Sequence, residues 1–138
     1  MKKLTKITTA LTILILLIVS VKISSSEKKI ILVSFTLSNK TGFNLKPNEL
    51  SFGKITPNQS ATRSVILQNL DKQKVKVKIE ASKNISDYII VTENNFFLSP
   101  NETKSLAFTI FTDGLTEFRE YTGAVTITTK KNFIIMFK

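Results

Sequence analysis

The sequence predicts an all-β protein whose main part is an antiparallel β-sandwich, and three observations support this fold class. Beyond residue 29, apolar residues recur at every second position, most clearly in "KVKVKIEA", where Val75, Val77 and Ile79 alternate with lysines and a glutamate. Short runs of β-branched and aromatic residues are separated by stretches of Asn, Asp, Gly and Pro that favour turns. No run after residue 29 has the spacing of an amphipathic helix, so a parallel sheet with helical crossovers is not expected.

The individual strands follow from these patterns in order along the chain. A short strand is expected to end at Phe52, before the turn at Pro57 and Asn58. The other expected strands are residues 30–37, 63–69, 74–81, 87–92, 96–98, 105–112, 120–129 and 133–137. About eight short strands in about 109 residues fit two sheets packed face to face.

The first 29 residues differ from the rest of the chain and predict an export segment. Lys2, Lys3 and Lys6 precede a continuous apolar run, residues 7–21. This run has the length of the apolar region of a signal peptide or of a short membrane anchor. We therefore divide the chain into an N-terminal apolar helix with a short linker, residues 1–29, and a sandwich, residues 30–138.

Cleavage and retention of the export segment remain alternatives. No Ala-x-Ala pattern follows the apolar run, and the three serines at 24–26 are the best small-residue stretch for a peptidase. The run reaches residue 23 if Lys22 extends toward lipid head groups, and it could then span a thin bilayer. The missing cleavage pattern favours an uncleaved signal anchor. A buried core helix is a third interpretation, which the absence of a polar face disfavours. The expected location is the cell membrane, single-pass with the C-terminal domain extracytoplasmic, or secreted if the segment is cleaved.

Composition excludes most catalytic chemistry. The chain has neither Cys nor His, so it lacks thiolate and imidazole groups for catalysis or metal binding. Its ten acidic residues form no paired-carboxylate motif. The net charge is +10, but arginine occurs only at Arg63 and Arg119, which disfavours nucleic-acid recognition. We predict no enzyme, no cofactor, no metal site, no nucleic-acid partner and no small-molecule substrate.

A set of motifs resembles the disulfide-free immunoglobulin-like domains of the ASH/MSP/hydin type. The resemblance covers residues 45–127 and rests on Leu50, Phe52, Gly53, Val65, Leu67, Asn69, Leu98, Pro100, Glu102, Thr103, Phe108 and Gly123. It implies an immunoglobulin-like sandwich that serves as a scaffolding or interaction module. The chain departs from the pattern by carrying Asn101 where glycine is usual. Because an export segment precedes the domain, cytoskeletal or ciliary roles are not carried over.

The Phe52-Gly53 pair also has a direct physical interpretation. A phenylalanine at the end of a short strand can close the base of a sandwich. The glycine after it permits a positive φ or a close backbone approach where the chain changes sheets. The pair is thus predicted to be a core plug and a corner.

Three surface features are candidates for function. Asn39, Asn58, Asn84 and Asn101 lie in Asn-x-Ser/Thr sequons within predicted turns, so they are candidate glycosylation sites. The lysine ladder, which comprises Lys72, Lys74, Lys76 and Lys78, predicts a solvated face, protection of a sheet edge, or a contact with an anionic surface such as lipid head groups.

The last strand, residues 133–137, is apolar on both faces. This pattern favours a central position in its sheet, with a strand offered to a neighbouring subunit as the alternative.

Together these features predict a non-catalytic, exported and membrane-anchored immunoglobulin-like module with a structural or protein-interaction role at the cell surface. Its expected partners are the membrane, through residues 7–23, and another surface protein. The alternative is a pilin-like or other surface-filament subunit whose apolar N-terminal segment packs in a fibre core. A carbohydrate-binding module is less favoured, because the chain has no Trp and only Tyr88 and Tyr121.

Overall fold

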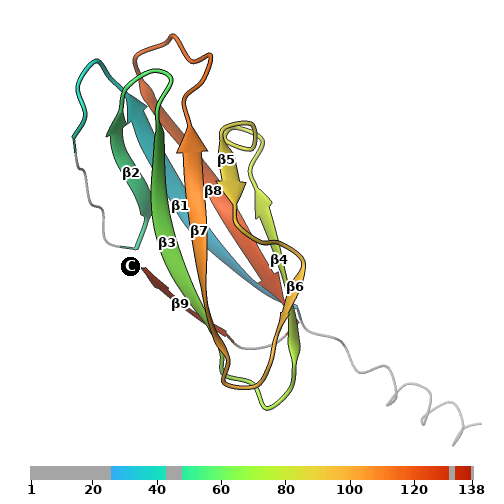
Figure 1. Cartoon of the computed structure of the whole chain (residues 1–138). Helices are drawn as coiled ribbons and strands as arrows, with labels where there is room; N and C mark the ends of the chain where they lie inside the picture. The colour runs from blue at the N-terminus through green and yellow to red at the C-terminus, as the bar shows by residue number, and fades with distance from the viewer. Residues whose placement is uncertain (1–25, 43–47, 131–132, 138) are drawn as a thin grey trace, which may run out of the picture.

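The computed structural model describes residues 26–42, 48–130 and 133–137, and these form nine strands (Figure 1). The strands are β1 (Glu27–Leu37), β2 (Leu50–Ile55), β3 (Ser60–Asn69), β4 (Val75–Ala81), β5 (Ile89–Val91), β6 (Phe96–Leu98), β7 (Thr103–Phe111), β8 (Glu120–Thr129) and β9 (Phe133–Phe137). The eight strands that the sequence analysis gave as residue ranges are present, and the short strand expected to end at Phe52 is β2, which continues to Ile55. Residues 83–88 form a hydrogen-bonded turn, so the strand expected at 87–92 is limited to β5.

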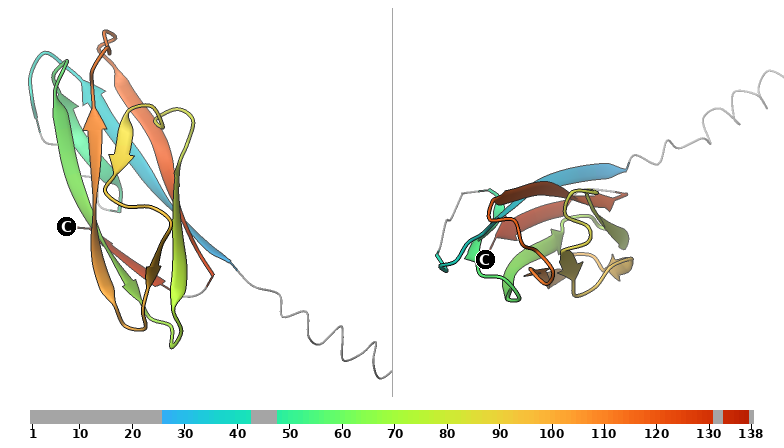
Figure 2. Two further views of the ribbon diagram at one scale, coloured as in Figure 1. Left: turned by 45° about the vertical axis from the view of Figure 1, so that its right-hand side comes forward. Right: turned by 90° about the horizontal axis from the view of Figure 1, so that it is seen from above.

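The strands form two facing sheets, which confirms the predicted all-β sandwich (Figure 2). Sheet A has the order β2-β1-β8-β4-β6, and sheet B has the order β5-β7-β3-β9. All pairings are antiparallel except that of β1 with β2, which is parallel. The predicted N-terminal helix, residues 7–23, lies outside the described residues. Within the described part of the chain, no helix is long and apolar enough to cross a membrane.

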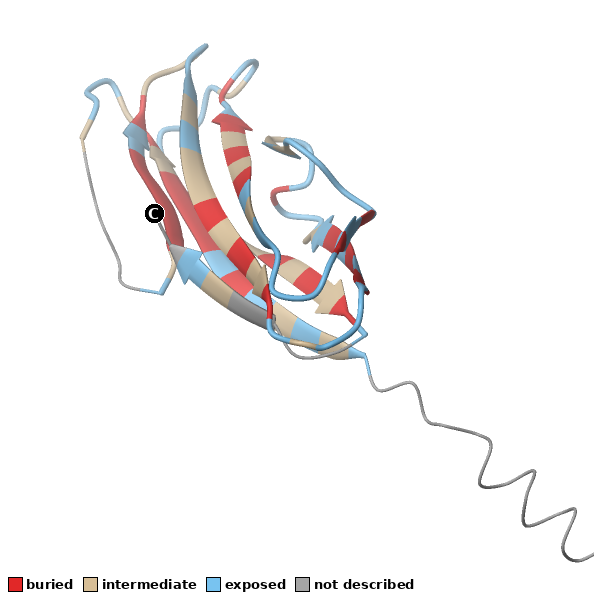
Figure 3. Ribbon diagram, turned by 60° about the horizontal axis from the view of Figure 1, so that its bottom comes forward, coloured by how far each residue is buried: buried red, intermediate tan, exposed pale blue. Residues whose placement is uncertain are grey.

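The core lies between the sheets and follows the alternation seen in the sequence. Val75, Val77 and Ile79 of β4 are buried, whereas the lysines between them are exposed. The same alternation buries Leu106, Phe108 and Ile110 on β7 and appears as bands along the strands in Figure 3. Since each buried Val or Leu side chain stabilises a fold by about 1.5–3 kcal/mol, this two-sided core holds the domain without disulfides.

Phe52 and Gly53 only partly meet their prediction. Phe52 is buried in the core, and Gly53 adopts a positive φ of 73°. However, Gly53 lies inside β2, where the register with β1 shifts between Ser34 and Thr36. The pair therefore forms a β-bulge within sheet A rather than the corner between sheets, which follows Ile55. A bulge needs the same freedom of φ as a corner, so the local motif alone does not distinguish them.

The predicted central position of residues 133–137 is wrong. β9 is an edge strand of sheet B and pairs with β3 alone in the described structure. Ile135 packs against the core, whereas Met136 is 40% exposed on the other face. When the outward residues of an edge strand are uncharged, its sequence has apolar residues on both faces and resembles that of a central strand.

Each end of the sandwich is closed by a buried polar side chain. At the end where β3 finishes, the Asn69 amide nitrogen lies 2.9, 3.2 and 3.0 Å from the carbonyl oxygens of Gln73, Leu98 and Ser99. The Asn69 side-chain oxygen accepts a 2.9 Å hydrogen bond from the backbone N–H of Asp71. The sequence pattern that ends a strand in asparagine therefore describes a corner, which joins β3, the following turn and the end of β6.

At the opposite end, the buried side chain of Thr112 closes the sandwich. Its hydroxyl lies 2.8 Å from the carbonyl oxygen of Thr56 and 2.9 Å from that of Gln59, and it accepts a hydrogen bond from the Gln59 backbone N–H. Phe35 stacks on Tyr121 at 4.9 Å between ring centroids at this end of the core. The Tyr121 hydroxyl in turn donates a hydrogen bond to the carbonyl of Glu117. This bond joins the loop at residues 112–119 to β8.

Candidate interaction surfaces

The outer face of sheet B carries no charged side chain among the residues described. Its side chains are set by the alternation that buries Val65 and Leu106, with outward positions at every second residue. The outward-facing residues are Thr62, Ser64, Ile66, Gln68, Ile90, Ser105, Ala107, Thr109, Phe111 and Met136. Protein interfaces are depleted of charge at their centre, so this surface, the sheet B face, has the composition of a protein-docking surface.

The sheet B face is also only partly apolar. Ile90 is 61% exposed, and it lies beside Thr109 in the register of β5 with β7. Thr109 shares a 2.9 Å hydroxyl hydrogen bond with Thr62 of β3. A partner that binds this face would meet exposed methyl groups and hydroxyls without having to strip water from a charge.

The outer face of sheet A has the opposite composition. Lys28, Lys76, Lys78 and Glu80 face outward on it from β1 and β4. Ile30 and Leu32 face outward on β1 beyond Lys28, and they are 68% and 56% exposed. This face combines lysine ammonium groups with exposed aliphatic side chains, whereas the described part of the sheet B face is uncharged.

Of the lysine ladder, Lys76 and Lys78 lie on β4 and Lys72 and Lys74 precede it, and β6 covers the β4 edge as far as Val77. This pairing disfavours the edge-protection interpretation. β4 is flanked by β8 and β6 in sheet A. Lys74 and Lys76 place their ammonium groups 5.0 and 6.0 Å from the ring centroid of the exposed Phe97, whereas Lys78 pairs with Glu80 at 2.7 Å. The ladder is therefore solvated, and part of it forms a cation–aromatic cluster with β6.

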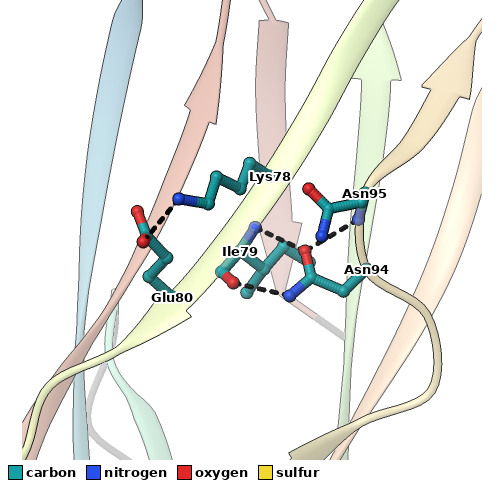
Figure 4. A network of polar contacts seen from close by, with 5 residues as sticks. All are labelled: Lys78, Ile79, Glu80, Asn94 and Asn95. Carbon is teal, nitrogen blue, oxygen red and sulfur yellow. Dashed lines mark hydrogen bonds and ion pairs between the residues drawn. The ribbon is translucent and has the colours of Figure 1, made fainter.

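The exposed edge of β4 beyond β6 is closed by a side chain. β6 pairs with β4 only as far as Val77. At Ile79 the Asn94 amide takes the place of a strand: its nitrogen donates to the Ile79 carbonyl at 2.7 Å, and its oxygen accepts from the Ile79 N–H at 2.8 Å (Figure 4). The sequence analysis did not single out Asn94, because its position in "TENN" is that of an ordinary turn residue.

A groove of about 400 Å³ opens at the side of the sandwich, between β2 and β3. Its lining includes Phe52, Lys54, Ile55, Ala61 and Arg63. Arg63 donates from Nε to the carbonyl oxygen of Ser51 at 3.1 Å and so latches sheet B to sheet A. The lining contains no carboxylate, so the groove has no acid and base pair for hydrolysis or proton transfer.

Groups for metal binding are also missing from the described residues, since no three His, Cys, Asp or Glu side chains come together there. The chain has no His or Cys at all.

The four sequon asparagines are all exposed and lie in turns. Asn39, Asn58 and Asn84 follow β1, β2 and β4 at one end, whereas Asn101 lies between β6 and β7 at the other. Asn58 and Asn101 adopt positive φ values of 57° and 59°. Asparagine tolerates this conformation better than most residues, which explains how Asn101 stands where the resembled pattern has glycine. Glycosylation of these sites stays a prediction.

The fold and its surfaces define a class of protein: a disulfide-free immunoglobulin-like sandwich that offers faces and edges for contact. The family model of flagellar-associated PapD-like domains matches residues 41–136, and the chain belongs to this family. The match confirms the resemblance stated from the sequence, and such domains are non-catalytic in general and mediate protein–protein interactions. Neither the curated proteins nor the solved structures that were searched contain a match.

Proposed function

We propose that this protein is an exported, membrane-anchored interaction module, which holds a protein partner at the cell surface through the sheet B face. The observation that carries the proposal is the apolar run at residues 7–23, which is preceded by lysines and lies N-terminal to β1 and to the matched family domain, residues 41–136. The uncharged sheet B face supplies the docking surface. The family's description associates it with flagella. A ciliary role is not part of the proposal, because the export segment would place the domain outside the cytoplasm.

Fractionation and N-terminal sequencing of the native protein test the anchor and the location. Recovery from Met1 in carbonate-washed membranes, with the domain cleaved by protease added to intact cells, is the expected result. Recovery in the medium with a start near residues 24–27 would show a secreted protein and replace the anchor with a signal peptide. A full-length chain in the cytoplasm would overturn export altogether.

Crosslinking in intact cells tests the docking surface. A photoreactive residue at Ser105, which is exposed on the sheet B face, should yield a discrete crosslinked product of higher mass. The matched control is Thr122, which is exposed on the outer face of sheet A. Equal products from both positions, or products from Thr122 alone, would contradict docking on sheet B.

A surface-filament subunit is the second candidate, and the position of β9 favours it. β9 is an edge strand with an exposed Met136, so its free side is available for pairing with a strand of a neighbouring copy. If filaments form, the protein should appear in sheared surface material. Met136→Lys should remove it from that fraction while leaving the domain folded, because a charge on an edge opposes strand addition.

Glycosylation is the remaining part of the proposal. Asn39, Asn58 and Asn84 would place glycans at the end opposite the start of β1, where they would project away from an anchor. Loss of mass on enzymatic deglycosylation of the native protein, abolished by Asn→Gln at each modified site, tests this expectation. An unchanged mass would remove the modification from the proposal.

A further inference from the structure

Positive charge is concentrated at the end of the sandwich where β1 begins. The cross-strand register places Lys28 and Lys78 on either side of Thr128, on the outer face of sheet A. The turn between β3 and β4, the start of β4 and the end of β8 meet at the same end (Figure 1). The exposed lysines gathered there are Lys28, Lys72, Lys74, Lys76, Lys78 and Lys130, and we call them the basic patch.

Few acids neutralise the basic patch. Glu80 pairs with Lys78, and Asp71 and Glu102 lie in the neighbouring turns. Glu27 points to the other side of β1 and pairs with Lys29 at 3.8 Å. The aromatic ring under Lys74 and Lys76 carries no charge of its own. Positive charge therefore exceeds negative charge at this end.

The opposite end of the long axis is different. It carries Asp87, Asp113, Glu117 and Glu120, and these four acids are balanced by Lys40, Lys54, Lys83 and Arg119. Arg119 already pairs with Glu117 at 2.8 Å. The domain is thus electrically polarised along its strands, with the positive end at the start of β1.

Exposed apolar side chains accompany the basic patch. Ile30 and Leu32 follow Lys28 on the same outer face, and Phe97 is 53% exposed beside Lys76. Surfaces that lie at lipid head groups combine lysines with exposed aliphatic and aromatic residues in this way. The long lysine stems let the apolar groups approach the acyl boundary while the ammonium groups remain among the phosphates.

The length of the linker fixes how far this end can lie from an anchored segment. Between residue 23, the last of the apolar run, and Glu27, the first of β1, four Cα steps span at most about 14 Å. Charges act over about 8–10 Å at physiological salt, so part of the basic patch must lie within reach of the head groups.

We infer that the basic patch binds anionic lipid head groups and holds the domain in one orientation on the bilayer. The inference rests on the proposed membrane anchor and adds the lipid class and the orientation. In this orientation the sheet B face and the far end remain free for a protein partner. Each engaged lysine should favour the bound orientation about fivefold over an uncharged surface.

The absence of cysteine makes the orientation measurable in the full chain. Gln73→Cys labels the exposed turn beside the basic patch, and Thr116→Cys labels the exposed loop at the opposite end. Each labelled chain is reconstituted in bilayer discs with a head-group quencher, either zwitterionic or containing about 30% anionic lipid. Position 73 should be quenched in anionic discs and released at about 1 M salt, whereas position 116 should stay unquenched in both.

Two triple variants with the same change in net charge separate the basic patch from overall charge. Lys72→Gln, Lys74→Gln and Lys76→Gln together should lower the ratio of bound to detached domains about 100-fold. Lys40→Gln, Lys54→Gln and Lys83→Gln, which lie away from the patch, should leave quenching at position 73 unchanged. Circular dichroism of both variants checks that the fold is retained.

The outcomes distinguish this inference from the proposed anchor. Suppose that the chain resists carbonate extraction, but that quenching at position 73 is independent of lipid charge or changes equally in both triple variants. This result would support the anchor and overturn the inference. A chain that binds only anionic discs, and leaves them at high salt, loses the anchor but retains the lipid-binding patch. Salt-sensitive quenching that only the patch variant abolishes supports the inference.

Discussion

The two ends of the sandwich are closed by the same kind of device and carry opposite surfaces. Asn69 closes the end where β1 begins, and Thr112 closes the other, each with a buried side chain bonded to turn carbonyls. Lysines outnumber acids around the first end, whereas charges of the two signs balance at the second, which also carries three of the four sequons. The side chains that close the two ends are therefore buried, and the surface charge around each end can differ while the closing hydrogen bonds stay the same. Substitutions in the interior should change stability the most, and substitutions of the surface lysines should mainly change binding.

The largest effect is expected at the far end, from Phe35→Ala. Phe35 is buried, stacks on Tyr121 and meets Tyr88 edge-on at 6.3 Å between centroids. Removing the ring should lower the free energy of unfolding by about 3–5 kcal/mol, through lost burial and a cavity. Urea unfolding measures it, with the exposed Phe118→Ala as control, for which a change within about 0.5 kcal/mol is expected. Equal losses from both variants would show that the aromatic cluster does not hold this end.

Asn69→Ala should have the next largest effect, at the basic end. Its two amide hydrogens serve three carbonyl oxygens, one of them in a buried bond to Leu98. Leaving these groups unpaired should cost about 2–3 kcal/mol in free energy of unfolding. Asn69→Asp keeps the shape and replaces the donors with an acceptor, so it should restore none of this loss. Full stability in the aspartate variant would contradict the corner described here.

Thr112→Val is the matched change at the far end and should cost less, about 1–2 kcal/mol. The single hydroxyl hydrogen can serve only one carbonyl at a time, and all its bonds are part-buried, so water can replace them. Thermal unfolding of Asn69→Ala and Thr112→Val under the same conditions shows which closing side chain contributes more to stability. A larger loss from Thr112→Val than from Asn69→Ala would reverse that ranking.

Much of the interior could be predicted from the sequence, because burial follows a period of two. The alternation on β4 and β7 fixed which side chains enter the core, and eight of the strands followed from it. Strand order could not be predicted, since alternation says nothing about neighbours in a sheet. For this reason the predicted central position of residues 133–137 was wrong, and the sequence left open whether the lysine ladder lies on an edge strand.

The surfaces were less predictable than the core. The sheet B face has a signal in the sequence, because the outward positions of residues 62–68 and 105–111 lack charge. It becomes one surface only when β3 and β7 pair. The basic patch likewise joins β1, β4 and the end of β8, which are far apart in the chain but meet in sheet A. Asn94 acts as a strand partner only because β6 ends early, which depends on tertiary pairing.

The smallest expected effect distinguishes the two ends by pH. Glu102 accepts a 2.6 Å hydrogen bond from the Ser99 backbone N–H in the turn beside Asn69. This bond, a further one from the Ser99 side chain, and the nearby Lys104 and Lys74 hold the pKa of the Glu102 carboxyl below its usual value. Because the folded pKa is lower than the unfolded one, the carboxylate stabilises the fold above the unfolded pKa. This stabilisation is lost as the pH falls through the folded pKa.

Glu102→Gln should therefore lower the urea midpoint slightly at pH 7 and leave it equal to that of the parent chain at strongly acid pH. Other acids titrate in both proteins, so the difference between the two curves isolates Glu102. Thr112→Val offers the comparison at the far end, because threonine does not titrate and its cost should be the same at both pH values. If the urea midpoints of Glu102→Gln and the parent chain differed by the same amount at every pH, the charge of Glu102 would not stabilise the turn. The two ends would then differ in surface charge but not in the electrostatics of their closure.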